Sequence, residues 1–133
     1  MSDSLLTPDQ QTRLDRESIL WLTTVRPNGQ PQTLPVWYVL DGSEILVWSF
    51  DGVRVKNLAT NSKVSAHVNN DGRGGNILTI EGTAVIDRKR GLASEHAKYV
   101  DRYQSFLSSY DWTWDWFCGK YSVPIVINPS KAR

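Results

Sequence analysis

Apolar and polar side chains alternate over much of the chain, a pattern typical of β-strands. Segments rich in β-branched and aromatic residues predict strands over residues 19–25, 32–40, 44–50, 63–68, 76–86 and 121–128. The pairs Asn28-Gly29 and Asp41-Gly42 separate neighbouring segments, and such pairs favour tight turns. Because most links are too short for a crossover, we expect the strands to pair antiparallel.

Three segments have the spacing of short helices instead. Thr7 precedes Pro8, and Gln10 stands where a capping box requires it, so a helix is predicted over residues 8–15. Two further helices are predicted over residues 53–60 (apolar face Val55, Leu58 and Ala59) and 92–103 (stripe Leu92, His96, Tyr99 and Tyr103). Six strands with two or three short helices predict one mainly-β domain over residues 1–133, built as a small barrel.

Composition narrows the classes of function. The net charge of +1 argues against a nucleic-acid partner, and the apolar runs are too short to cross a membrane. The N-terminal Met-Ser-Asp-Ser does not open an export signal, and Cys118 is the single cysteine. These features predict a cytoplasmic protein.

The sequence lacks the motifs of several enzyme classes. It has no zinc-ligand spacing, no Gly-x-Ser-x-Gly elbow and no phosphate loop ending in Gly-Lys-Ser/Thr. His67, His96 and Cys118 have no partner set for catalysis, so we expect no catalytic side chain among them and no metal site. An enzyme of this kind needs a cofactor that carries the difficult chemical step.

The segment 49–58 is the first candidate binding site. A strand ends there, a glycine turn follows, and the predicted helix begins with Arg54 and Lys56 in its first turn. Cations at a helix N-terminus oppose the helix dipole by about 0.3–1 kcal/mol each, and a bound phosphate would reverse that penalty. The alternative is that Asp51 caps the helix and both cations are solvated. The residues alone leave both interpretations open.

Two other segments carry candidate contacts. Pro35 lies within a predicted strand and implies an edge or a bulge, which is either a place where a flat ligand can approach the backbone or simply an ordinary edge strand. Trp112, Trp114 and Trp116 alternate, so in an extended conformation they would share one face. Such an apolar face is typical of a subunit interface or of a ligand pocket across that interface.

Several short motifs, in order along the chain, resemble those of one known family. They are Gln-Pro-Gln-Thr-Leu-Pro-Val-Trp-Tyr (30–38), Val-Trp-Ser-Phe (47–50), Arg-x-Lys-Asn-Leu-x-x-Asn (54–61), Val-Ser-Ala-His-Val (64–68) and Ile-Glu-Gly-Thr-Ala (80–84). Together they resemble the pyridoxamine 5′-phosphate oxidase-like split β-barrel superfamily. The closest resemblance is to the actinobacterial branch that uses the deazaflavin coenzyme F420. It implies a six-stranded, antiparallel split barrel of Greek-key type that binds its cofactor in a groove between two barrels of a homodimer.

The resemblance also implies roles for individual residues. Arg54 and Lys56 would hold the cofactor phosphate, helped by Ser49 and Asn57. The remaining implied cofactor contacts are Gln32, Pro35, Val36, Trp37, Phe50, Gly75, Asn76 and Trp116, the last of these reaching the pocket from the partner chain.

The function that follows from the resemblance is an F420-dependent reductase. It would transfer a hydride from the reduced cofactor to a small, planar, electron-poor substrate without a side-chain base. The alternatives are an FMN-dependent oxidase or reductase of the same fold, and a non-catalytic cofactor-binding or carrier protein.

Overall fold

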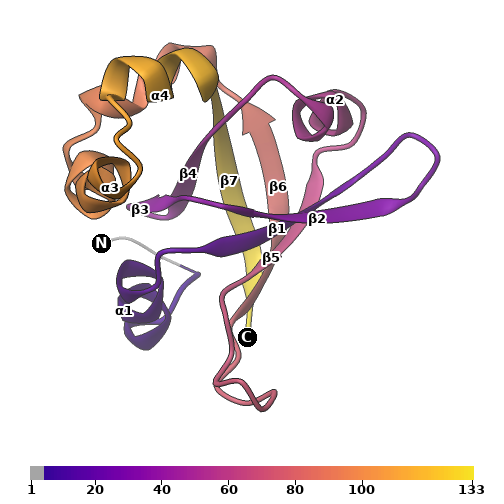
Figure 1. Cartoon of the computed structure of the whole chain (residues 1–133). Helices are drawn as coiled ribbons and strands as arrows, with labels where there is room; N and C mark the ends of the chain where they lie inside the picture. Colours follow the sequence, from indigo (N-terminus) through magenta and orange to yellow (C-terminus); the bar gives the residue numbers. More distant parts are fainter. Residues whose placement is uncertain (1–4) are drawn as a thin grey trace.

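The structure is a computed structural model and describes residues 5–133 (Figure 1). Its described part contains seven strands: β1 (Leu20–Val25), β2 (Pro31–Val36), β3 (Val39–Asp41), β4 (Glu44–Ser49), β5 (Lys63–His67), β6 (Thr79–Ile86) and β7 (Val123–Ala132). The α-helices are α1 (Pro8–Arg16), α2 (Val53–Thr60), α3 (Ala97–Ser109) and α4 (Trp114–Lys120), with 3₁₀ turns at Arg88–Arg90 and Ala93–Glu95. The Met-Ser-Asp-Ser segment, on which part of the localisation prediction rests, lies outside the described residues. No helix of residues 5–133 is long and apolar enough to span a membrane.

The strands form one antiparallel sheet in the order β2-β1-β5-β6-β7-β4-β3. β2 and β3 stand at the two ends of this order, yet only Trp37 and Tyr38 separate them in the chain. The sheet must therefore curl, and Figure 1 shows β2 continuing across the molecule into β3. The result is the predicted split barrel, with seven strands in place of six because the predicted strand 32–40 is divided at this crossover.

The hydroxyl group of Tyr103 on α3 stabilises the crossover. The backbone N–H of Tyr38 donates to Tyr103 Oη at 2.9 Å, and the same hydroxyl lies 2.9 Å from the carbonyl oxygen of Tyr38. Backbone groups at a strand break lose their ladder partners and must be paired elsewhere when buried. A helix side chain thus supplies the hydrogen bonds that a neighbouring strand would supply in a regular sheet.

Strands β3 and β4 and the first half of β7 (residues 123–127) are largely buried on both faces. In β4, Ile45 and Val47 point into the barrel, whereas Leu46 and Trp48 pack under α3 and α4. Successive strand residues point to opposite faces of a sheet, so the uninterrupted apolar run in β4 reflects two separate packing layers. We call them the barrel core, which is mainly aliphatic, and the aromatic layer, which contains Tyr99, Tyr103 and Phe117.

Most predicted elements are confirmed, with shifted ends. The capping box at Thr7 and Gln10 is present, and α2 has the predicted bounds. The strand predicted from Asn76 begins at Thr79, and the last strand runs on to Ala132. The helix predicted over 92–103 begins at Ala97 and reaches Ser109. Two apolar-face predictions were wrong, since Ala59 and Leu92 are exposed.

The segment from Trp112 to Trp116 does not adopt the extended conformation in which its tryptophans would share one face. Thr113 caps a helix, α4, by accepting from the Trp116 N–H at 3.1 Å. Asp111 ends α3 with a positive φ of 58°, and the Trp112 N–H returns to the Leu107 carbonyl. This is the arrangement of a Schellman C-cap. The three tryptophans therefore do not share one face.

Candidate functional site

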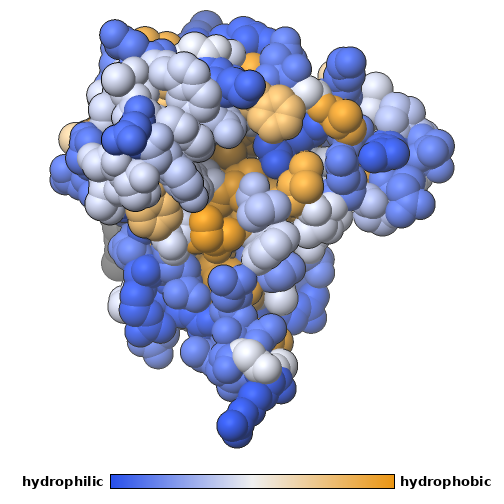
Figure 2. Space-filling view, in the orientation of Figure 1, coloured by the Kyte–Doolittle hydropathy of each residue, from blue (hydrophilic) through white to orange (hydrophobic). Residues whose placement is uncertain are grey.

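An apolar cavity of about 490 Å³ opens between the β2–β3 crossover, the start of α2 and the α3–α4 pair. Figure 2 shows this hollow as an orange, hydrophobic groove in an otherwise polar surface. Its wall is largely aromatic, formed by Trp37, Trp48, Phe50, Tyr99, Tyr110, Trp112, Phe117 and Tyr121. A cavity of this size and lining is typical of a site for a planar organic molecule.

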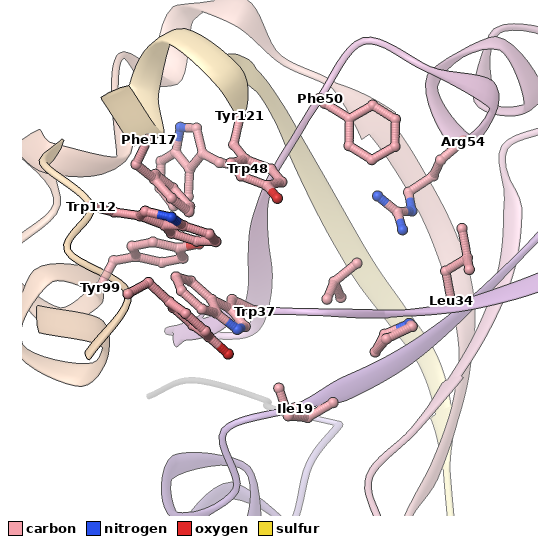
Figure 3. Close-up of a pocket in the computed structure, with 13 residues that line it drawn as sticks. Ile19, Leu34, Trp37, Trp48, Phe50, Arg54, Tyr99, Trp112, Phe117 and Tyr121 are labelled. Atoms are coloured by element: carbon pink, nitrogen blue, oxygen red, sulfur yellow. The ribbon is translucent and has the colours of Figure 1, made fainter. Parts of the chain in front are cut away.

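Arg54 is the one charged residue in the wall of this cavity among residues 5–133. It is only 7% exposed, and its Nη1 donates to Ser49 Oγ at 2.9 Å. No carboxylate forms an ion pair with it in the described part of the chain. Burial lowers the pKa of its guanidinium, which nevertheless stays charged at neutral pH. Figure 3 shows this group pointing into the pocket from α2.

The start of α2 leaves room beside Arg54. Gly52 is the N-cap and gives the helix no side-chain hydrogen bond, so the alternative in which Asp51 caps the helix is not what the structure shows. A Cβ at Gly52 would lie 2.4 Å from the ring of Phe50, an exposed side chain that would have to rotate to make room for it. The first N–H groups of α2 are thus free of a side-chain cap, as in anion sites at helix N-termini.

Lys56 lies apart from Arg54, as residues two positions apart on a helix do. Its side chain is exposed, whereas that of Arg54 is buried. The two predicted phosphate contacts are therefore not equivalent within one chain. Arg54 alone is directed into the cavity.

A second polar pair supports the other side of α2. The buried Asn57 amide donates to Thr24 Oγ1 at 3.0 Å and lies 3.5 Å from Gln32 Oε1. These bonds tie α2 to β1 and β2. Of the predicted contacts, Ser49 thus holds Arg54 at the start of α2, and Asn57 anchors the middle of the helix beside Gln32, which gives Ser49 and Asn57 a positioning role.

The predicted ring contacts Pro35, Val36 and Trp37 all line the cavity. β2 is an edge strand of the sheet order, as Pro35 predicted. The indole of Trp37 is held between Tyr103 and Phe117, with ring centroids 4.7 and 5.4 Å apart and planes within 4° and 8° of parallel. This stacking fixes one wall of the site.

Seven predicted contacts do not line this cavity: four lie on or beside α2, namely Gln32, Ser49, Lys56 and Asn57, and three lie apart from it, namely Gly75, Asn76 and Trp116. Gly75 and Asn76 lie in the loop before β6, at the opposite end of the barrel from α2 (Figure 1), where Asn76 borders a second hollow beside α1. Trp116 is 45% exposed and packs against Trp112 with the rings tilted by 39° and the centroids 4.6 Å apart. A role for these three residues at the cofactor would require a second copy of the chain, and it stays a prediction.

The titratable residues set aside in the sequence lie outside the described wall of the cavity. His67 stacks on Trp21, and His96 caps α3 by accepting from the Tyr99 N–H. Cys118 is buried in the aromatic layer.

Sequence reasoning missed several wall residues, above all Tyr99, Tyr110 and Tyr121. Tyr99 was predicted to lie on an apolar helix stripe, which is correct, but the stripe gave no sign that it borders a cavity. The three residues become neighbours only when α3 and α4 pack over β3 and β4. Their spacing along the chain contains no signal for that packing.

Solved structures share this architecture. An F420 reductase superposes with a TM-score of 0.70 at 22% identity, covering 96% of this chain and 98% of the other. An FAD-binding protein from Mesorhizobium loti gives 0.65 at 19% identity, with coverage of 96% and 90%. The heme storage protein HutZ from Vibrio cholerae gives 0.64 at 15% identity, with coverage of 98% and 94%. At these identities the similarity establishes the fold.

The sequence itself matches a family description. A search of curated proteins found no match. The sequence model of the pyridoxamine 5′-phosphate oxidase family, however, matches residues 6–111. That span includes β1 to β6, α2 and most of the cavity wall, and it covers well over half of the chain. The chain therefore belongs to the pyridoxamine 5′-phosphate oxidase family.

Proposed function

We propose that the protein is an F420-dependent reductase, which passes a hydride from reduced deazaflavin to a small, planar, electron-poor substrate. The observation that carries the proposal is the buried guanidinium of Arg54, which has no carboxylate partner among residues 5–133. A buried charge without a counter-charge is costly. A cofactor phosphate would supply the missing anion, and the F420 reductase of the same fold favours the deazaflavin.

The residues present fit such a cofactor. Arg54 and the uncapped start of α2 would hold the phosphate, and Ser49 would orient the guanidinium. Pro35, Val36 and Trp37 would form the apolar wall along the ring. The bound deazaflavin would supply the hydride chemistry. The protein would align the ring with the substrate and exclude water, and alignment alone is worth up to about 7–11 kcal/mol in favourable cases.

The proposal includes a homodimer. Leu34, Phe50 and Val53 are 39–44% exposed beside the cavity, so apolar surface surrounds its mouth. Gly75 and Asn76, predicted to approach the cofactor, lie away from this cavity in one chain. A second copy would cover the apolar surface and bring these residues to the site. We expect light scattering to give twice the chain mass at micromolar concentration, and a monomer mass would contradict the dimer.

The choice of cofactor is tested by titrating the purified protein with F420 and with FMN, following cofactor fluorescence. We expect F420 to bind more tightly. An FMN preference of tenfold, about 1.4 kcal/mol, would instead support an FMN-dependent enzyme of the same fold. Tight F420 binding without turnover of planar nitro or carbonyl compounds would support a carrier protein.

The phosphate site is tested by comparing Arg54→Met with Lys56→Met. Both variants remove one cation from the same helix, but only Arg54 is buried in the cavity. Loss of a charge-assisted hydrogen bond of about 1.5–3 kcal/mol predicts ten- to a hundredfold weaker F420 binding for Arg54→Met. We expect less than about a threefold change for Lys56→Met, because exposed charges interact weakly.

The stability of the cofactor-free variants is part of the same test. The melting temperature of Arg54→Met should be unchanged or higher, because methionine fills the space without burying an unpaired charge. F420 dissociation constants within twofold of wild type for Arg54→Met would contradict the phosphate assignment.

A further inference from the structure

The hydroxyl group of Tyr99 has no use in the architecture of the protein. Tyr99 lies on α3, is fully buried and lines the aromatic end of the cavity. Its Oη has no hydrogen-bond partner among residues 5–133. A buried hydroxyl without a partner costs about 1–3 kcal/mol. Phenylalanine would fill the same space without that cost, so the hydroxyl calls for an explanation.

Tyr103, one helical turn further along α3, shows what a structural tyrosine hydroxyl does in this layer. It accepts from the Tyr38 N–H and lies 2.8 Å from the carbonyl oxygen of Ser18. The two rings are 4.8 Å apart and equally buried. The helix therefore satisfies the hydroxyl of Tyr103 completely and leaves the buried hydroxyl of Tyr99, a residue of the cavity wall, without a partner among residues 5–133.

The surroundings of Tyr99 fix its position. Trp48 lies 4.8 Å from the Tyr99 ring and Phe117 lies 6.1 Å from it, centroid to centroid. Burial raises the pKa of Tyr99 well above its ordinary value, so the group is a neutral hydrogen-bond donor throughout the physiological range. Figure 3 shows Tyr99 with the aromatic group on one side of the pocket and Arg54 on the other.

We propose that Tyr99 determines specificity by donating a hydrogen bond to an oxygen acceptor, such as a carbonyl or nitro group, on a planar substrate bound at the aromatic end of the cavity. The inference rests on the proposed function in taking this cavity as the substrate site. The aromatic wall accepts any flat molecule of suitable size. The orphan donor then favours those that carry an acceptor, because only they compensate the buried hydroxyl.

The test uses a matched pair of probes with the cofactor-free protein. 9-Fluorenone and fluorene have the same fused rings, but only fluorenone carries a carbonyl oxygen. Equilibrium dialysis should show wild type binding fluorenone more tightly than fluorene. Tyr99→Phe should weaken fluorenone binding about three- to tenfold, the value of one neutral hydrogen bond, and leave fluorene binding unchanged.

Tyr103→Phe is the control, since it removes a satisfied hydroxyl from the same layer and lies outside the wall of the cavity. It should lower the melting temperature and leave the fluorenone-to-fluorene affinity ratio as in wild type. Tyr99→Phe should keep or raise the melting temperature.

Three results would overturn the inference: an unchanged affinity ratio in Tyr99→Phe, no binding of fluorenone to wild type, or a melting temperature of Tyr99→Phe as low as that of Tyr103→Phe. Neither probe carries a phosphate, so the outcome is separate from the F420 titration. If F420 does not bind but Tyr99→Phe changes the ratio, the proposed function fails and this inference stands. If F420 binds but Tyr99→Phe leaves the fluorenone-to-fluorene affinity ratio unchanged, the proposed function stands and this inference fails.

Discussion

The barrel core and the aromatic layer share strands β3, β4 and β7 but differ in how completely they are packed. The barrel core is built from aliphatic side chains, many less than 2% exposed, and the hydroxyl of its single tyrosine, Tyr38, donates to the Leu14 carbonyl. The aromatic layer borders a cavity and includes a hydroxyl without a partner among residues 5–133. The difference indicates that the barrel core supplies stability, whereas the aromatic layer gives up part of its packing to form the cavity.

The largest expected effect comes from opening a hole in the barrel core. Ile127 is fully buried on the inner strand β7, between Ala84 of β6 and Ile45 of β4. Ile127→Ala should lower the free energy of unfolding by about 3–4 kcal/mol, through lost apolar contacts and the cavity left behind. Urea unfolding measures this value. A loss below about 1 kcal/mol would mean that the barrel core is not the stabilising unit.

Two glycines allow the same substitution to be compared in the two regions. A Cβ at Gly82 would lie 2.3 Å from the backbone oxygen of Asn128, at the bulge between β6 and β7, where the strands cannot separate without losing hydrogen bonds. Gly82→Ala should cost about 2–3 kcal/mol. At Gly52 the obstacle is the ring of Phe50, which is 44% exposed and can rotate away.

Gly52→Ala should therefore cost less than about 1 kcal/mol in urea unfolding and act on the cavity instead, by displacing Phe50 from its wall. Fluorenone affinity is the measurement for that effect. Equal losses of stability for the two alanine variants would remove the distinction between a packed barrel and an adaptable site.

The sequence predicted the strands of the barrel well, because the alternation of apolar and polar residues along a strand follows which side chains are buried. Val64 and Ala66 in β5 point inward, as their spacing predicted. The division at Trp37-Tyr38 could not be predicted, because it depends on pairing with opposite edges of the sheet and on the Tyr103 hydroxyl, sixty-five positions away. The helix α4 was missed because three alternating tryptophans outweighed the capping signal of Thr113.

The candidate site was predictable only in part, because some of its features depend on contacts between residues that are far apart in the sequence. Arg54 stood out because a cation in the first turn of a helix without nearby acids is locally unfavourable, and local conflicts are visible in a sequence. The sequence did not distinguish Arg54 from Lys56, because burial of one and exposure of the other depends on how α2 packs against β1. Tyr99 showed no such conflict in the sequence, because whether its hydroxyl finds a hydrogen-bond partner depends on the packing of the whole fold.

Raising the pH from 8 to 10 tests the buried tyrosines of the barrel core and of the aromatic layer together. Burial raises the pKa values of Tyr38, Tyr99 and Tyr103 in the folded protein above the ordinary value of 10.0. The unfolded chain loses these protons first, so stability is intact at pH 8, begins to decline as the pH approaches 10 and declines further above it. Between pH 8 and pH 10 each group contributes a loss of about 0.4 kcal/mol, giving about 1 kcal/mol for the three.

Urea midpoints at the two pH values measure this loss, and absorbance at 295 nm follows ionisation. Tyr38→Phe and Tyr99→Phe should each reduce the alkaline loss. At neutral pH, however, only Tyr38→Phe of these two variants should be destabilising, because the hydroxyl of Tyr38 donates to the backbone carbonyls of α1 and its C-cap, whereas that of Tyr99 has no partner among residues 5–133. Ionisation of all five tyrosines near pH 10 in the folded protein would contradict the assigned burial.

The smallest expected effect is that of Trp116→Ala. Trp116 is half exposed and contacts Trp112, which is itself held by Tyr110 at 4.6 Å, so the wall of the cavity should survive the loss. We expect about 0.5 kcal/mol of destabilisation, the lower end for an aromatic pair. Because Trp116 lies outside the cavity of its own chain, the F420 affinity of Trp116→Ala should stay within twofold of the wild-type value. A tenfold loss of affinity in Trp116→Ala, with unfolding unchanged, would instead place Trp116 of a second copy over the cofactor. The aromatic layer would then contain residues of two subunits, whereas each barrel core would contain residues of one subunit.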